Sequence, residues 1–494
     1  MPDALTAPFG IEHVFVLMLE NRSFDHMLGF SGISGVDAET GVSTGVRGLT
    51  GNESNLYNGQ VIPVAKGANM VMPTDPGHEF ADVLHQLCGP AASYTAGGNY
   101  PPVDNSGFVA SYVACGGLVP GEVMRCYAPG QLPVLNALAR EFVVCDNWHA
   151  SLPGPTWPNR MFVHAASSGG LDHSPSVLEI ANWEALAGFE FENGTIFDRL
   201  VQNGIRRRIY GGDDFPMVAA LKGIGLGDVR HYSLFAGDVA AAGYADQYIF
   251  IEPSYDVFHH YQGGTSQHPL GDVTKGEALI KATYEAIRNS PAWDSSLLII
   301  TWDEHGGFYD HDAPGFAVPP GDAVLDATYN QNGFTFDQYG VRVPALVISP
   351  RIPRNLVDHR DYDHSSIPAT LETLFGMAPM TARDAAANPL SALVTLAEPR
   401  RDAPQYLPNP APELVTPPDP TAAQPTVAPA ESANKGNVPA IIHAAMQQDI
   451  AAAPQLREMI VERVKQIQTR ADARQYLREV QARVIPIRTA VAQS

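Results

Sequence analysis

The feature that most constrains the fold is an apolar segment near the N-terminus that ends abruptly in polar residues. The run from His13 to Leu19 (HVFVLML) is apolar after its first residue, and Glu20 and Asn21 follow it at once. A continuous apolar run of this length is typical of a strand buried on both faces, as in the centre of a parallel sheet. Ligands bind at the carboxyl edge of such sheets. The segment therefore predicts an α/β fold with functional residues from position 20 onward.

The same pattern recurs far downstream, where the apolar run 296–302 (SLLIITW) leads directly into two acidic residues. If both strands belong to one sheet, three carboxylates and one amide converge at one edge: Glu20, Asn21, Asp303 and Glu304. Such a cluster would be costly to bury without a cation or a proton. We therefore expect one or more divalent metal ions there. Oxygen ligands suit Ca²⁺, Mg²⁺ or Mn²⁺. Zn²⁺ or iron is a further alternative if a histidine is also a ligand.

Three motifs in a fixed order resemble a known family of enzymes. They are ENRSFDH at residues 20–26, GPTWPNR at residues 154–160 and DEHGGFYDH at residues 303–311. This set is similar to the phosphoesterases that include non-specific phospholipases C and acid phosphatases, within the alkaline phosphatase superfamily. The resemblance extends over residues 10–380, and three long motifs are far more specific than one short pattern. It implies an alkaline phosphatase-like α/β/α sandwich with a mostly parallel central sheet.

The resemblance also implies roles for individual side chains. Thr156 matches the position of the family's nucleophile, between a Gly-Pro turn and the start of a helix, where a phosphate is attracted. A threonine hydroxyl is a weak nucleophile that needs a base or a metal, and the expected metal cluster supplies the latter. His78 and His268 match histidines that lie near the reacting phosphate. The side chains expected in the site wall or behind it are Asn159, Arg160, His305, Asp310, His311 and His364.

Other polar residues stay open at this stage. Glu252 ends a further predicted strand at 247–253, either near the site or at an edge. His259 and His260 cannot both face one way in an extended segment, so at most one of them is expected to be functional. The four cysteines fit no zinc or CxxC spacing and leave two disulfides or reduced thiols as alternatives.

Composition excludes some classes of function. The chain has 494 residues and a formal net charge of −22, which argues against general binding of nucleic acid. No apolar run approaches the length that spans a bilayer. Residues 1–10 show no secretory signal, so the location is either cytoplasmic or exported with a signal that this chain lacks.

The chain is expected to divide into three parts. Residues 1–398 form the catalytic domain, with 31–130 partly a cap or insertion; residues 399–440 are a linker rich in Pro and Ala; and residues 441–494 form a helical tail. The tail has more Lys and Arg than Asp and Glu. It is expected to dock on the catalytic domain, to join copies in a homo-oligomer, or to lie on an anionic membrane surface.

These observations predict a metal-dependent phosphoric ester hydrolase. The preferred activity is phospholipase C-type hydrolysis of phosphocholine-like phosphodiesters through a phosphothreonine, with a phosphate ester or phospholipid as substrate. An acid phosphatase of the same family and a catalytically silent scaffold protein are the alternatives. A sulfatase is disfavoured, because sulfatases use a modified cysteine in a Cys-x-Pro-x-Arg context, and here Thr156 is the residue that precedes Trp157 and Pro158.

Overall fold

The computed structural model describes residues 8–412 and 430–493. Residues 1–7 and 413–429 and the last residue lie outside the described part. The expectation about a secretory signal concerns residues 1–10, and most of these lie outside the described part. The middle of the expected linker, residues 399–440, lies outside it too.

The described chain is built on a ten-stranded sheet with the strand order β10-β9-β11-β1-β12-β13-β8-β14-β2-β3. Five neighbouring strands from β10 to β12 run parallel, β13 is antiparallel to both of its neighbours, β8, β14 and β2 are parallel, and β3 is antiparallel to β2. The strands are β1 His13–Leu19, β2 Ser34–Asp37, β3 Ser43–Gly45, β8 Val143–Cys145, β9 Arg207–Gly211, β10 Val229–His231, β11 Tyr248–Glu252, β12 Ser296–Trp302, β13 Ala345–Ile348 and β14 Leu356–Asp358.

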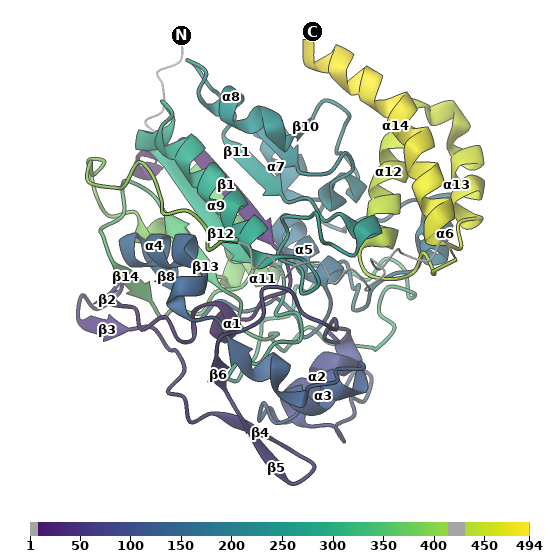
Figure 1. Cartoon of the computed structure of the whole chain (residues 1–494). Helices are drawn as coiled ribbons and strands as arrows, with labels where there is room; N and C mark the ends of the chain where they lie inside the picture. The colour runs from purple at the N-terminus through teal and green to yellow at the C-terminus, as the bar shows by residue number, and fades with distance from the viewer. Residues whose placement is uncertain (1–7, 413–429, 494) are drawn as a thin grey trace.

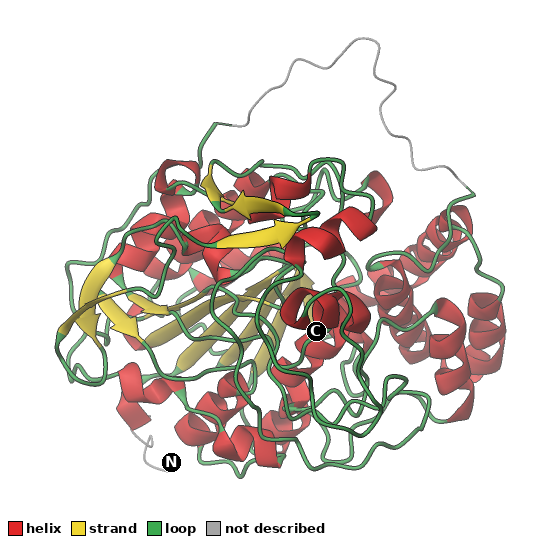
Figure 2. Cartoon of the chain, turned by 90° about the horizontal axis from the view of Figure 1, so that it is seen from below, coloured by secondary structure: helices red, strands yellow, loops and turns green. Residues whose placement is uncertain are grey.

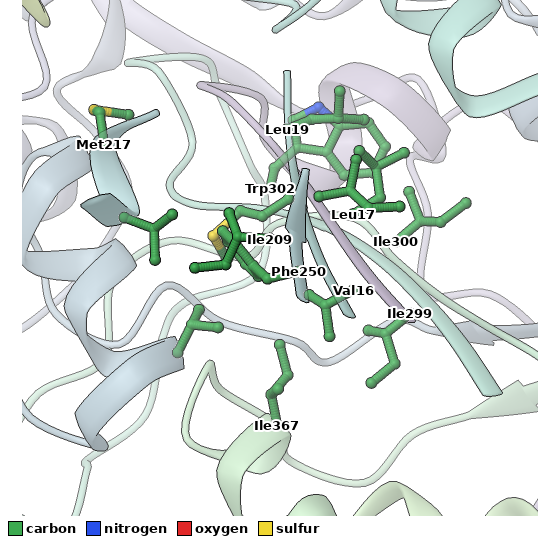
Figure 3. Close-up of a cluster of buried hydrophobic side chains, with 14 of the residues drawn as sticks. Val16, Leu17, Leu19, Ile209, Met217, Phe250, Ile299, Ile300, Trp302 and Ile367 are labelled. Carbon is green, nitrogen blue, oxygen red and sulfur yellow. The ribbon is translucent and has the colours of Figure 1, made fainter. Parts of the chain in front are cut away.

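The two strands that carry the acidic motifs are neighbours. β1 and β12 pair in parallel along their whole length, from His13 opposite Ser296 to Leu19 opposite Trp302. All residues of both strands are buried. Figure 3 shows the side chains of Leu19 and Trp302 lying together at the ends of these strands. The prediction that both motifs leave one sheet at the same edge is confirmed.

Helices cover both faces of the sheet, which confirms the predicted α/β/α sandwich. On one face, Phe15 of β1 packs edge-on against Phe235 of α8 (Phe235–Val239), with ring centres 6.1 Å apart. On the other face, His164 of α5 (Thr156–Ala165) packs against Phe250, 4.7 Å between ring centres. Ile367 of α10 (Ser366–Phe375) points toward Val16 on this second face (Figure 3). The strands therefore lie enclosed between helices, as Figure 2 also shows.

The remaining helices and the small sheets complete the body. Residues 54–126 contain two small sheets, β4-β5 and β6-β7, and a separate hydrophobic core under α2 and α3. Their bounds are β4 Ser54–Tyr57, β5 Gln60–Pro63, β6 Ala65–Lys66, β7 Arg125–Cys126, α1 Phe24–Leu28, α2 Phe80–Cys88, α3 Phe108–Ala114, α4 Pro133–Glu141, α6 Val177–Leu186, α7 Ile196–Gln202, α9 Val273–Arg288 and α11 Ala382–Ala386.

The C-terminal region is helical, as predicted for the appendage, and packs on the body. It consists of α12 Val438–Ala452, α13 Arg457–Lys465 and α14 Arg470–Gln493, drawn in yellow in Figure 1. α12 contacts α6 as well as α13 and α14. Before it, residues 403–407 lie along α9, where Tyr284 donates a hydrogen bond to the carbonyl of Pro404 at 2.6 Å. Across the described residues, every helix is too short or too polar to cross a membrane.

Candidate active site

The candidate site forms where β1 and β12 end. Asn21 has a positive φ of 58°, a conformation that few residues other than glycine adopt, and its N–H donates to Asp303 Oδ1 at 3.0 Å. A strained residue of this kind persists only where its surroundings hold it, and such residues gather at functional sites. The turn after β1 is thus fixed by the carboxylate that follows β12.

Two glycines let three loops meet at this point. Gly306 and Gly307 both have positive φ, 64° and 74°. A Cβ at Gly306 would collide with the carbonyl oxygen of Asn21, and one at Gly307 would lie 2.6 Å from the carbonyl oxygen of Gly77. The turn after β12 can therefore approach the loop after β1 and the loop before α2 only because these two positions carry no side chain.

Three buried oxygen atoms at this junction have no hydrogen-bond donor among the described residues. They are Glu20 Oε2, Asn21 Oδ1 and Glu304 Oε1. Burial and the neighbouring carboxylates raise the pKa of Glu20 and of Asp303. Orphaned, buried oxygens of two carboxylates and an amide are the ligands that hard divalent cations prefer. The residues present therefore fit the metal that the sequence predicts.

Asp303 is held differently from the other three expected ligands. Its Oδ1 accepts the N–H groups of Asn21 and Glu304, the latter at 2.7 Å, and its Oδ2 accepts Arg160 Nε at 2.8 Å. Arg160 also donates to the carbonyl of Leu19 at 2.9 Å. Both groups are buried, so Arg160 compensates the charge of Asp303 and ties α5 to the ends of both strands.

Thr156 is the first residue of α5, and its hydroxyl lies within this junction. Asn21 Nδ2 donates to Thr156 Oγ1 at 3.4 Å. Asn159, one turn later, accepts the N–H of Leu152 at 3.1 Å and donates to the carbonyl of Gly154 at 2.9 Å. Asn159 therefore holds the preceding turn against the helix and fixes the position of Thr156. Its side chain is used in these contacts rather than facing a ligand.

His78 lies beside the same groups. Its Nδ1 is 3.5 Å from Asn21 Nδ2 and 3.7 Å from Glu304 Oε1. Burial lowers the pKa of this imidazole, but the carboxylates of Glu304 and Asp75 outweigh it and raise the pKa to about 9. In the absence of a metal His78 is therefore a cation at neutral pH.

His268 is held as a neutral ring. The N–H of Leu270 donates to His268 Nδ1 at 3.2 Å, so the ring proton of the neutral form is on Nε2, which lies 3.6 Å from Asp75 Oδ2. Burial, together with the positive charges of His78 and Arg22, holds the pKa of His268 well below its usual range. The ring also stacks flat on Tyr261, with centres 3.5 Å apart. His268 is thus a hydrogen-bond donor rather than a base.

The remaining predicted histidines have other neighbours. His305 lies 2.7 Å from Gln86 Oε1 through Nε2, and His364 donates to the carbonyl of Asp303 at 2.6 Å, so both support the turn after β12. His311 belongs instead to a second cluster, where its Nδ1 lies 2.6 Å from Asp25 Oδ2 and where Asp310 binds Arg342.

The residues left open by sequence lie away from Thr156. Glu252 is buried and accepts the backbone N–H groups of Met217 and Val218. His259 has a 70% exposed side chain and pairs with Asp256. All four cysteines are free thiols, so the alternative of two disulfides is wrong for this structure.

A cavity of about 330 Å³ is lined by four of the predicted site residues, Glu20, His78, Thr156 and His268. Two residues that sequence reasoning did not single out contribute to it. One is Asp75, three residues before His78. The other is Asn437, just before α12, whose side chain donates to Glu20 Oε1 and whose N–H donates to the hydroxyl of Tyr261. No local pattern marks Asn437, whereas the Asp75-Pro-Gly-His78 spacing was a usable signal. The lining residues are Glu20, Asp75, His78, Glu79, Thr156, Trp157, Ser174, Pro175, Ser176, His268, Asn434, Gly436, Asn437, Pro439 and Ala440.

Comparison with known proteins agrees with this geometry. The profile of the phosphoesterase family matches residues 11–378. Non-specific phospholipase C6 of Arabidopsis thaliana is 36% identical over 84% of this chain and 78% of its own length. Phospholipase C A of Mycobacterium tuberculosis is 28% identical over 74% of this chain and 73% of its own. The solved structure of a Vibrio parahaemolyticus protein in the alkaline phosphatase superfamily aligns over 72% of this chain and 73% of its own. The identity is 16% and the TM-score is 0.31.

The family profile covers both strands that carry the acidic motifs, the helix that begins at Thr156 and the loops that carry His78 and His268. The motifs on which the resemblance rests therefore come together in one place in the fold. The chain belongs to the phosphoesterase family and is a phosphoric ester hydrolase.

Proposed function

We propose that the protein is a metal-dependent phospholipase C-type enzyme that uses Thr156 as its nucleophile. The observation that carries this proposal is that Thr156 accepts a hydrogen bond from Asn21 and lines one cavity with Glu20. The buried oxygens Glu20 Oε2, Asn21 Oδ1 and Glu304 Oε1 have no donor among the described residues. A divalent cation bound by Glu20, Asn21 and Glu304, with Asp303 beside them, would favour the alkoxide of Thr156 and offset negative charge on the transferred phosphoryl group.

The chain's own groups then perform the transfer. The Thr156 oxygen attacks phosphorus, a bond from oxygen to phosphorus forms, and the bond to the diacylglycerol oxygen breaks. His78, whose Nδ1 lies 3.7 Å from Glu304 Oε1, can donate to the phosphoryl oxygens, and the position of Thr156 at the start of α5 favours the same negative charge. The proton of the Thr156 hydroxyl passes to solvent, and the leaving oxygen takes a proton from solvent while the neutral ring of His268 hydrogen-bonds to it through Nε2–H. Water then attacks the phosphothreonine and releases the phosphorylated head group together with free Thr156.

The choice of a phospholipid diester over a monoester rests on the relatives that are named as phospholipases C. An acid phosphatase would use the same nucleophile and metal ligands, so substrate preference is the distinguishing measurement. Association with a membrane surface and assembly through α12–α14 stay proposals.

The test compares p-nitrophenyl phosphorylcholine with p-nitrophenyl phosphate. We expect turnover of the diester that a chelator abolishes, that divalent metal restores, and that Thr156→Ala lowers by at least about 10³-fold. Thr373→Ala, which removes a hydroxyl of α10 that bonds the carbonyl of Ala369, is the matched control and should keep full activity. Preference for the monoester would assign an acid phosphatase. Activity that survives Thr156→Ala would exclude the phosphothreonine, and absence of turnover with any metal would leave only the scaffold alternative.

A further inference from the structure

The cavity that contains the Thr156 hydroxyl has an acidic lining. Its residues include the carboxylates of Glu20, Asp75 and Glu79, and neither Lys nor Arg is among them. Its volume of about 330 Å³ is at the low end of the range for ligand sites, which suits a phosphate with its head group rather than two acyl chains. The cationic ring of His78 lines the same cavity and offsets only part of this negative charge. A substrate with an anionic head group would meet the remaining negative charge there.

Two of these carboxylates already have partners in the chain. Glu20 accepts the side-chain amide of Asn437 and belongs to the expected metal ligands. Glu79 accepts the N–H of Ser174 at 3.3 Å and, with Asp82, forms the capping box of α2. Their charges are therefore committed to the fold or to the metal.

Asp75 is different. Its side chain is 38% exposed and lines the cavity, while its Oδ1 has no hydrogen-bond partner among the described residues. The nearest ring nitrogen, His268 Nε2, lies 3.6 Å from Oδ2 and belongs to a neutral imidazole, because Leu270 N–H occupies Nδ1. This neutral donor can orient the carboxylate without cancelling its charge. The cationic ring of His78 opposes the charge of Asp75, but it is also shared with Glu304, 3.7 Å away. Asp75 thus offers a negative charge to whatever fills the cavity.

A phosphodiester that carries its own positive charge would offset this carboxylate. An ammonium separated from the phosphate by two carbons can approach Asp75 while the phosphate stays near Thr156, because both residues line one small cavity. We propose that Asp75 pairs with the ammonium of a phosphocholine or phosphoethanolamine head group and determines the head-group preference of this site. The inference rests on the proposed phospholipase C-type function and identifies Asp75 as the residue that recognises the head group.

The decisive experiment removes the positive charge from the substrate without changing its shape. Two substrates are compared by kcat/KM: p-nitrophenyl phosphorylcholine and p-nitrophenyl 3,3-dimethylbutyl phosphate, in which carbon replaces the quaternary nitrogen. We expect the wild-type protein to prefer the choline diester by about 10- to 100-fold. Asp75→Asn should lose most of this preference. Its kcat/KM should fall for the choline diester and stay unchanged for the 3,3-dimethylbutyl diester. Asp104→Asn removes one exposed negative charge outside the cavity and should leave the preference unchanged.

Several results would overturn the inference. Equal wild-type turnover of both substrates would reject the head-group role while the proposed function stands, whereas turnover of neither would reject both. An equal loss on both substrates in Asp75→Asn, or a lower metal content of that variant, would make Asp75 a structural residue or a metal ligand. If the variant does not fold, inhibition of the wild-type protein decides: phosphocholine should inhibit at least about 10-fold more strongly than 3,3-dimethylbutyl phosphate, and equal inhibition rejects the pairing.

Discussion

Two clusters of buried carboxylates follow the same pair of strands, β1 and β12, and in only one of them does a single guanidinium bridge the carboxylates. The site cluster consists of Glu20, Asn21, Asp303 and Glu304, and the arginine cluster consists of Asp25, Asp310, His311 and Arg342. In the arginine cluster, one guanidinium lies 3.2 Å from Asp25 and 2.8 Å from Asp310. In the site cluster, Arg160 reaches Asp303 alone, and the ring of His78 lies 3.7 Å from Glu304 Oε1, beyond hydrogen-bond distance. Three oxygens of the other members have no hydrogen-bond donor among the described residues.

The difference separates a structural ion network from a binding site made of the same residue types. Asp25, Asp310 and His311 come close enough together to resemble a metal site. The guanidinium of Arg342, fully buried, already lies among them and supplies their positive charge. Removing the cation from such a network leaves unpaired buried charge, whereas a site that awaits a ligand must stay folded without it. The two clusters should therefore respond in opposite ways to mutation.

The largest effect should come from the site cluster. We expect Glu304→Gln to lower kcat by at least about 10³-fold and to reduce the bound metal, because it removes the charge of an orphaned ligand oxygen. Its stability without metal should be unchanged or higher. Asp310→Asn is the counterpart in the arginine cluster and should retain the metal. Metal analysis and steady-state kinetics of the two variants check this, and an equal loss of metal from both would erase the distinction.

Arg342→Met should show the reverse pattern. The variant leaves Asp25 and Asp310 buried without their counter-ion, and we expect it to lower the free energy of unfolding by about 3 kcal/mol. The folded fraction should still bind metal. Urea unfolding measures the loss, and Arg354→Met, which removes a guanidinium with a 63% exposed side chain, is the control that should change little. A stability equal to that of the wild type would show that this cluster does not depend on Arg342.

A smaller effect should appear in the pH dependence of the metal-free protein. Burial first, then Asp303, raises the pKa of Glu20 from 4.5 to about 8. Between these values the folded protein holds a proton that the unfolded chain has released, so stability falls as pH rises from about 5 to about 8. Glu20→Gln should flatten this fall by on the order of 2 kcal/mol, and added metal should do the same in the wild type. Thermal unfolding with chelator at several pH values tests this; identical slopes for Glu20→Gln and the wild type would contradict it.

The sequence predicted the parts of the site that depend on local pattern. The apolar runs before Glu20 and Asp303 correspond to β1 and β12 with the observed bounds, because strands buried on both faces leave an unambiguous apolar signature. Thr156 begins a helix, as its Gly-Pro turn indicates. The antiparallel direction of β13 left no such signature, because its four residues form the same kind of buried apolar run as β12 and β8, to which it is antiparallel.

Long-range partners could not be predicted in the same way. Arg342 lies in the loop before β13, which begins at Ala345, and is buried against Asp25 and Asp310, 317 and 32 residues away in sequence. Asn437 lies just before α12, beyond a segment rich in proline, and its contact with Glu20 joins positions that no periodicity connects. Both depend on how distant segments pack, which hydrophobic patterning does not specify.

The contact between Asn437 and Glu20 has a consequence for the order in which a ribosome makes this protein. Synthesis runs from the N-terminus, so every expected metal ligand and the nucleophile emerge well before Asn437 does. At the usual rates of elongation, the interval between the emergence of Glu304 and that of Asn437 is on the order of ten seconds. During that time a nascent chain can assemble its acidic pocket while the amide that covers one carboxylate is still unmade. The pocket is therefore completed only late in the synthesis of each molecule.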